Sequence, residues 1–237
     1  FPGIDLLGMA FEQEGFTVVR GPDILWGGDI RGFHPPARIF NGVIGGPPCQ
    51  CFSRLARLNA RCGTRFGNLI PEFERVVEEA QPTWFLMENV EAAPLPFVGG
   101  YEVNELLLNN RWVGGSQNRL RRFSFGSKSG AMLMVEVVCL ENPIKTPAVT
   151  ASATVWVPVK LGGSGKVKST YEQERKGRPE GHVNTSYFRE AVVAQGLPTD
   201  FDLPCFTVRE KIRAVGNGVP LPMGRAIAKA VKKAMEL

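Results

Sequence analysis

The sequence lacks a long apolar segment, has only two histidines, and has no cysteine pair at metal-ligand spacing. No apolar run approaches the roughly 18–20 residues that a membrane-spanning helix requires, which argues against a membrane protein. The five cysteines are odd in number, and the spacing of Cys49 and Cys51 does not match a zinc site. We therefore expect no metal site and a reduced, intracellular protein with one useful thiol.

No secretory signal is visible in the sequence given. The chain starts at Phe1 without a methionine, inside a short motif, so we expect upstream residues that limit any argument about targeting. Hydrophobic residues make up 43% of the 237 residues and charged residues 22%, which excludes an intrinsically disordered chain. The length suits one large domain, or a core with a small appendage.

Acidic residues are absent from 111–130, where five basic residues occur within a chain of net charge +5. A second basic group has helical spacing and consists of Arg54, Arg57, Arg61 and Arg65. Such a row is typical either of a solvated helix face or of a set of phosphate contacts beside an active site. The sequence leaves both interpretations open.

Apolar patterns predict short strands alternating with helices in the first half. We expect strands at 17–19, 41–44, 83–87 and 122–126, and helices at 6–16, 71–80 and 102–110. This alternation predicts a mostly parallel sheet with helices on both faces. Residues 127–187 are rich in Gly, Ser, Thr, Pro and Lys, which favours a small second lobe. An apolar face from Met223 to Ala234 predicts a last helix that returns to the first lobe.

Ligands of such sheets bind where the strands end. Four segments there carry chemically useful groups: 1–3, 28–30, 47–50 and 88–90. Cys49 follows two prolines that stiffen the turn, and it is either a nucleophile or an inert structural thiol. Glu88 is either a proton donor or an acid that caps a helix or forms an ion pair.

Three further features have both a functional and a structural interpretation. Arg119 and Arg121 alternate along a strand, so their guanidinium groups form either an anion-binding fork or an exposed charged edge. Asp29 either accepts a hydrogen bond from a nucleoside amine or caps the turn that follows it. The Gly216–Pro220 turn before the last helix needs no function to explain it.

The order of these segments resembles that of the DNA (cytosine-5) methyltransferases. The resemblance covers nearly the whole chain except about 127–187. It depends on Pro48-Cys49-Gln50, Glu88-Asn89-Val90, Gln117-x-Arg119-x-Arg121, Gly216-Asn217-x-Val219-Pro220, and the stretch Gln195–Phe201. Each motif alone is weak, whereas together and in this order they are specific.

This resemblance implies an α/β fold of the class I, Rossmann-like, S-adenosylmethionine-dependent type, with a mixed sheet, helices on both faces and a small target-recognition lobe. The catalytic domain would comprise 1–126 and 206–237, and the recognition domain with its hinge 127–205. The resemblance further implies three sets of site residues. The catalytic set is Cys49, Glu88, Arg119 and Arg121. The cofactor-binding set is Phe1, Gly3, Ile4, Asp29, Ile30, Pro48, Leu69, Asn217 and Val219. The DNA-binding set is Gln50, Ser53, Arg54, Arg57, Gln117, Lys166 and Lys168.

The implied activity is that of a DNA (cytosine-5-)-methyltransferase. A methyl group passes from S-adenosyl-L-methionine to C5 of a flipped-out cytosine through a covalent Cys49–C6 adduct, leaving S-adenosyl-L-homocysteine. Double-stranded DNA would be the partner, and the enzyme would act as a monomer in a prokaryotic or viral-host cytoplasm without a membrane partner. Two alternatives stay open, namely an RNA (tRNA) cytosine-5 methyltransferase and a catalytically inactive DNA-binding homologue. The target sequence and any restriction endonuclease partner are not readable.

Two positions depart from the family's pattern. Asp5 stands where the last glycine of a Phe-x-Gly-x-Gly loop is expected, and we expect it to adopt a left-handed backbone, which Asp tolerates better than most residues. The acid that holds the cofactor ribose in the family has no clear equivalent here. Arg20 lies near that place, and Asp23 is the candidate substitute.

Overall fold

The computed structural model describes residues 1–48, 52, 67–138, 146–147, 149 and 185–236. The helices are α1 (Leu6–Gln13), α3 (Ile70–Ala80), α5 (Thr185–Ala194), α6 (Val208–Asn217) and α7 (Leu221–Ala234), with short 3-10 helices η1 (Ile24–Trp26), η2 (Ile30–Gly32) and η3 (Asn110–Val113). The strands are β1 (Gly42–Gly45), β2 (Trp84–Asn89), β3 (Glu102–Asn109), β4 (Gln117–Asn118), β5 (Leu120–Ser127) and β6 (Thr146–Pro147).

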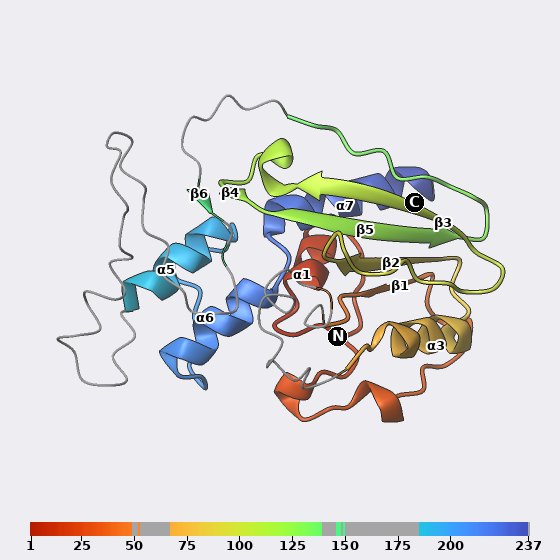
Figure 1. Cartoon of the computed structure of the whole chain (residues 1–237), viewed down its shortest axis with the longest axis horizontal. Helices are drawn as coiled ribbons and strands as arrows, with labels where there is room; N and C mark the ends of the chain where they lie inside the picture. The colour runs from red at the N-terminus through yellow and green to blue at the C-terminus, as the bar shows by residue number, and fades with distance from the viewer. Residues whose placement is uncertain (49–51, 53–66, 139–145, 148, 150–184, 237) are drawn as a thin grey trace.

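The main sheet has the order β1-β2-β5-β3, and helices cover both of its faces (Figure 1). Every residue of β2 is buried, and its side chains alternate between the two faces. Trp84 and Leu86 pack with α1 and α7 on one face. Phe85 and Met87 pack with α3 on the other. This arrangement confirms the predicted α/β architecture with a mixed sheet.

The helices α5 and α6 form a second packed group beside this sheet (Figure 1). Phe188 and Val192 of α5 share one buried cluster with Ile212 of α6 and Leu6 of α1. The connection between the recognition segment and the last helix is therefore packed directly against the start of α1.

Three expectations about the elements are wrong. Residues 102–110 form the strand β3 because they pair antiparallel with the whole of β5. The segment 17–19 joins neither sheet, and Val19 is 67% exposed. The described part of the sheet is not mostly parallel, since β1 and β2 are parallel but β5 runs antiparallel to both of its neighbours. The other expected helices and strands are confirmed within a few residues at their ends.

Candidate active site

The carboxyl ends of β1 and β2 meet because these strands are parallel, with Gly45 opposite Met87. The Asn89 side-chain amide donates a hydrogen bond of 3.2 Å to the carbonyl of Pro47. A Cβ added at Gly46 would lie 3.2 Å from Oε2 of Glu88, so a larger residue there would require the carboxylate to shift by a few tenths of an ångström. The loop that leads to residue 49 is thus held against the end of β2, as the strand-end argument predicts.

Glu88 forms an ion pair with Arg121 of the neighbouring strand β5. Nε of Arg121 lies 2.9 Å from Oε1 of Glu88, and the two side chains are only 19% and 11% exposed. The antiparallel register of β2 and β5 places the two residues on the same face of the sheet. The structure therefore brings together two of the four predicted catalytic residues, in a setting with little solvent.

Arg119 is directed to different partners. Its guanidinium donates to the carbonyl of Val149 at 2.6 Å and to the carbonyl of Gly218 at 3.0 Å, and the residue is 2% exposed. These bonds tie the segment before β5 to the turn between α6 and α7. In this geometry Arg119 supports the site by holding backbone, whereas the prediction has it in contact with base or phosphate.

Gln117 is fully buried, and the predicted DNA contact finds no support in its position. Its side-chain NH2 donates to the carbonyl of Ala194 at 2.8 Å and to Oε1 of Gln195 at 2.9 Å, and its own Oε1 accepts from the amide of Val149 at 3.0 Å. Both amide N–H groups are therefore directed to protein acceptors. Gln117 joins the strand β4 to the end of α5.

Gln195 is a structural residue to which the sequence argument assigned no role. Its NH2 group donates to the carbonyls of Val215 and Gly218, at 2.6 and 3.2 Å, and its own backbone carbonyl accepts from Leu221. The residue is 0% exposed. Gln195 is the first residue of the Gln195–Phe201 stretch of the family resemblance, and this motif is the sequence feature that could have identified it. With Gln117 and Arg119 it forms a buried polar cluster that fixes the turn 216–220.

A small apolar cluster joins η2, β1 and α3. Ile30 and Leu69 are buried with Val76, and the Phe1 ring packs on them. Pro48 follows at the end of the β1 loop and is half-buried. Three residues predicted for the cofactor site therefore form one contiguous apolar wall.

The glycine loop before α1 is held by η1. The amide of Gly3 donates to Oδ2 of Asp23 at 2.8 Å, and its carbonyl accepts from Nε1 of Trp26 at 2.7 Å. Gly3 has a φ of 58°, and a Cβ added to it would meet nothing within 4 Å. Asp23 therefore holds the loop through its carboxylate, and open space lies next to Gly3. Ile4 follows as a half-buried residue on the apolar cluster of α5 and α6.

Asp5 adopts the left-handed conformation that we expect of it, with φ 63° and ψ 41°. Its carboxylate caps α1 by accepting from the amide of Gly8 at 3.1 Å, and it forms an ion pair with Arg20 at 2.7 Å. Burial raises the pKa of Asp5, and this effect exceeds the opposing effect of the Arg20 charge. Arg20 therefore pairs with the loop acid.

Asp29 caps η2 and is exposed. Its carboxylate accepts from the amide of Arg31 at 3.0 Å and pairs with the Arg31 guanidinium at 3.3 Å. The hydrogen bond from the backbone of Arg31 lowers the pKa of Asp29, so this acid is ionised at neutral pH and accepts hydrogen bonds. Asn217 is exposed at the end of α6, whereas the side chain of Val219 belongs to the core under α7.

The remaining predicted site residues lie outside the described residues. They are Cys49, Gln50, Ser53, Arg54, Arg57, Lys166 and Lys168. Within the described part of the chain, no helix combines the length and apolar character needed to cross a membrane.

Part of the segment that forms this site matches a known protein family. The model of the C-5 cytosine-specific DNA methylase family matches residues 27–94, which include the β1 loop, α3 and the end of β2. Type II methyltransferase M.HgiDI of Herpetosiphon aurantiacus is 34% identical over 100 residues. That match covers 38% of this chain and 32% of M.HgiDI, so it spans about a third of that protein.

Two comparisons extend over the whole chain. Type II methyltransferase M.NgoPII of Neisseria gonorrhoeae is 24% identical in an alignment that covers 100% of this chain and 95% of that protein. The structure of the Entamoeba histolytica methyltransferase EhMeth superimposes with a TM-score of 0.65 at 12% identity, covering 99% of this chain and 97% of that one. This likeness supports the class I methyltransferase fold.

Proposed function

We propose that this chain, whose residues 27–94 match the model of the C-5 cytosine-specific DNA methylase family, methylates C5 of cytosine in double-stranded DNA. The observation that carries the proposal is the Glu88–Arg121 pair, which lies against the loop that leads to Cys49. Cytosine C5 is a weak nucleophile and is hidden in the duplex stack. The base must therefore be extruded and its ring activated before it reacts.

Cys49 is the proposed nucleophile. Its thiolate forms a bond to C6 of the extruded base, and the electron pair of the C5–C6 double bond becomes available at C5. When C5 has taken up the methyl group, it loses its proton to solvent. The electron pair of that C–H bond restores the double bond and expels the Cys49 thiolate, so that the enzyme is regenerated and 5-methylcytosine remains.

Glu88 and Arg121 would stabilise the charge that develops on the ring during addition. The Glu88 carboxyl group would hydrogen-bond at N3 and the exocyclic amine, and Arg121 would hydrogen-bond to O2. Their ion pair fixes both side chains before the base arrives, and low exposure strengthens their interaction with it. Arg119 would act indirectly, because its bonds to the carbonyls of Val149 and Gly218 hold the backbone just before Arg121 in place.

The residues beside this pair suit S-adenosylmethionine, which supplies an activated methyl group when it is bound. The wall of Phe1, Ile30 and Leu69 offers an apolar surface to a purine, and ionised Asp29 offers an acceptor to its amine. The open space at Gly3 leaves room for a ligand close to the backbone. Asn217 and Val219 would complete the site through the turn that the buried polar cluster holds.

We propose that residues 127–205 form the part that recognises the DNA target. Residues 1–126 and 206–237 would together form the catalytic part. The residues that would contact the DNA are Gln50, Ser53, Arg54, Arg57, Lys166 and Lys168. Gln117 is omitted from this set because its amide is buried. The enzyme would act as a monomer on duplex DNA.

Transfer of tritium from labelled S-adenosylmethionine to duplex DNA tests this function. We expect incorporation with the wild-type protein and none with Cys49→Ser, because a serine hydroxyl is a far weaker nucleophile at neutral pH. Cys205→Ser is the matched control, since Cys205 is an exposed free cysteine to which no part in the reaction is assigned, and it should retain wild-type activity. Full activity of Cys49→Ser would reject the mechanism. Incorporation into structured RNA and not into DNA would replace the proposed substrate by the RNA alternative.

A further inference from the structure

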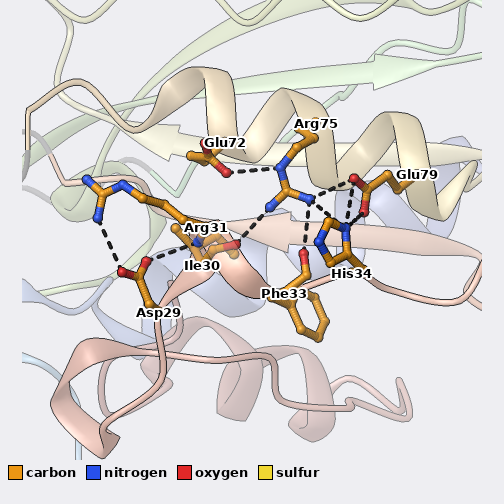
Figure 2. A network of polar contacts seen from close by, with 8 residues as sticks. All are labelled: Asp29, Ile30, Arg31, Phe33, His34, Glu72, Arg75 and Glu79. Carbon is orange, nitrogen blue, oxygen red and sulfur yellow. Dashed lines mark hydrogen bonds and ion pairs between the residues drawn. The ribbon is translucent and has the colours of Figure 1, made fainter.

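A network of polar contacts joins α3 to the turn that follows Asp29 (Figure 2). Arg75 lies at its centre and reaches from α3 to η2. Nη2 of Arg75 donates to the carbonyl of Ile30 at 2.8 Å, and Nη1 donates to the carbonyl of Phe33 at 3.0 Å. One side chain thus holds both ends of the four-residue turn, whose ends are also joined by the hydrogen bond from the amide of Phe33 to the carbonyl of Ile30.

The guanidinium is itself held in place by two carboxylates of its own helix. Glu72 accepts from Nε at 3.0 Å, and Glu79 accepts from Nη1 at 2.7 Å. These acids precede and follow Arg75 by one helical turn, where side chains on the same face meet. Glu79 also contacts Nδ1 of His34, the residue after the turn, at 3.0 Å. The arginine is therefore preorganised, and Arg75 and Glu79 together hold the segment at Ile30, Phe33 and His34.

The position of Asp29 depends on this turn. Asp29 caps η2, and the next residue, Ile30, supplies both a buried side chain in the apolar wall and the carbonyl that Arg75 binds. A shift of the turn would move the Asp29 carboxylate relative to that wall. It would do so without any change to the Glu88–Arg121 pair, which lies on other strands.

We propose that Arg75, held by Glu72 and Glu79, is a positioning residue for the nucleoside part of the methyl donor. It does not touch the ligand in this account, but fixes the turn that presents Asp29 and Ile30 to it. The inference rests on the proposed function, because it takes the surface of Phe1, Ile30 and Leu69 as the nucleoside site. Its chemistry requires a planar fork, since a lysine ammonium cannot bind two separate carbonyls and two carboxylates in this geometry.

Calorimetry with S-adenosylhomocysteine tests the proposal without requiring turnover. We expect Arg75→Lys and Arg75→Ala to weaken binding by about tenfold, which corresponds to the net loss of about one charged hydrogen bond. In the methylation assay, KM for S-adenosylmethionine should rise while kcat at saturating donor stays unchanged. Millimolar guanidinium should restore part of the affinity of Arg75→Ala, which a loss of general stability would not allow.

Arg38→Ala provides the matched control. Arg38 also bonds to the end of α3, through Gln81, but makes no contact with the turn, so this variant should bind as the wild type does. Wild-type affinity in both Arg75 variants would overturn the inference and leave the proposed function intact. An equal loss in Arg38→Ala would also overturn it. If the wild-type protein does not bind S-adenosylhomocysteine, the proposed function and this inference both fail.

Discussion

Asp5 shows how one residue that departs from a family pattern is accommodated. The loop requires a left-handed backbone at this position, and Asp supplies it while its carboxylate caps α1. The cost is a buried acid, which Arg20 offsets only in part, because burial still raises the pKa of Asp5. Glycine would avoid the buried charge but would lose the cap and the ion pair.

Asp5→Asn should therefore change the pH dependence of stability. An acid whose folded pKa is raised keeps its proton in the folded state after the unfolded chain has lost it, so the free energy of unfolding falls as pH rises from 3.8 through the raised value. Asn retains the left-handed backbone and the cap but does not titrate. Urea unfolding between pH 3.5 and about 7 should show the variant gaining stability relative to wild type as pH rises. A difference that shrinks with rising pH would contradict this account of Asp5.

Single residues of the site were predictable from the sequence where a chemically reactive or charged side chain also lies at the end of a predicted strand. Glu88 and Arg121 illustrate this, since a carboxylate after an apolar strand and an arginine on an alternating strand meet in the structure. Gln117 and Arg119 illustrate the limit. Their motif identifies important residues, but burial and partners depend on the α5–α7 region, which is distant in sequence.

At the scale of elements, a buried polar cluster joins pieces that are far apart in the chain. Gln195 at the end of α5 binds the carbonyls of Val215 and Gly218 near the end of α6, while Gln117 binds Gln195 from β4. Every one of these groups would cost free energy if it were buried without a partner. The cluster therefore determines how α5 and the turn before α7 sit on the sheet.

Gln195→Met should cost about 2–4 kcal/mol of unfolding free energy, because a side chain of similar size leaves buried amide and carbonyl groups unpaired. Denaturant unfolding measures the loss. Val193→Met is the control on the same helix, since Val193 is 58% exposed and a surface change there should stay within about 0.5 kcal/mol. A Gln195→Met cost as small as that of the control would show that the cluster does not stabilise the fold.

Element type was predictable where apolar spacing was decisive and failed where pairing decided it. Residues 102–110 have a run of leucines that is compatible with a helix, but β5 offers them a complete antiparallel partner. The valines at 18 and 19 have strand propensity and no partner among the described strands, so they form no ladder. Strand pairing is a long-range property, and local patterns do not encode it.

On the scale of the whole molecule, the fold places chemistry from separate strands in one region. The α/β class and the meeting of strand ends follow from the alternation of apolar segments, whereas the antiparallel position of β5 between β2 and β3 does not. That position matters, because β5 brings Arg121 beside Glu88. The apolar wall and the acid of η2 lie on the α3 side of the same strand ends.

The central claim is that Cys49 forms a covalent bond to C6 of cytosine. A duplex library of random sequence that contains 5-fluorocytosine tests it directly, because fluorine at C5 cannot leave as the proton does and the adduct cannot resolve. With S-adenosylmethionine present, we predict a protein–DNA complex that survives denaturation, and peptide mass spectrometry should locate the bond at Cys49. A complex linked through another residue, or no complex with a protein that methylates ordinary DNA, would contradict the account.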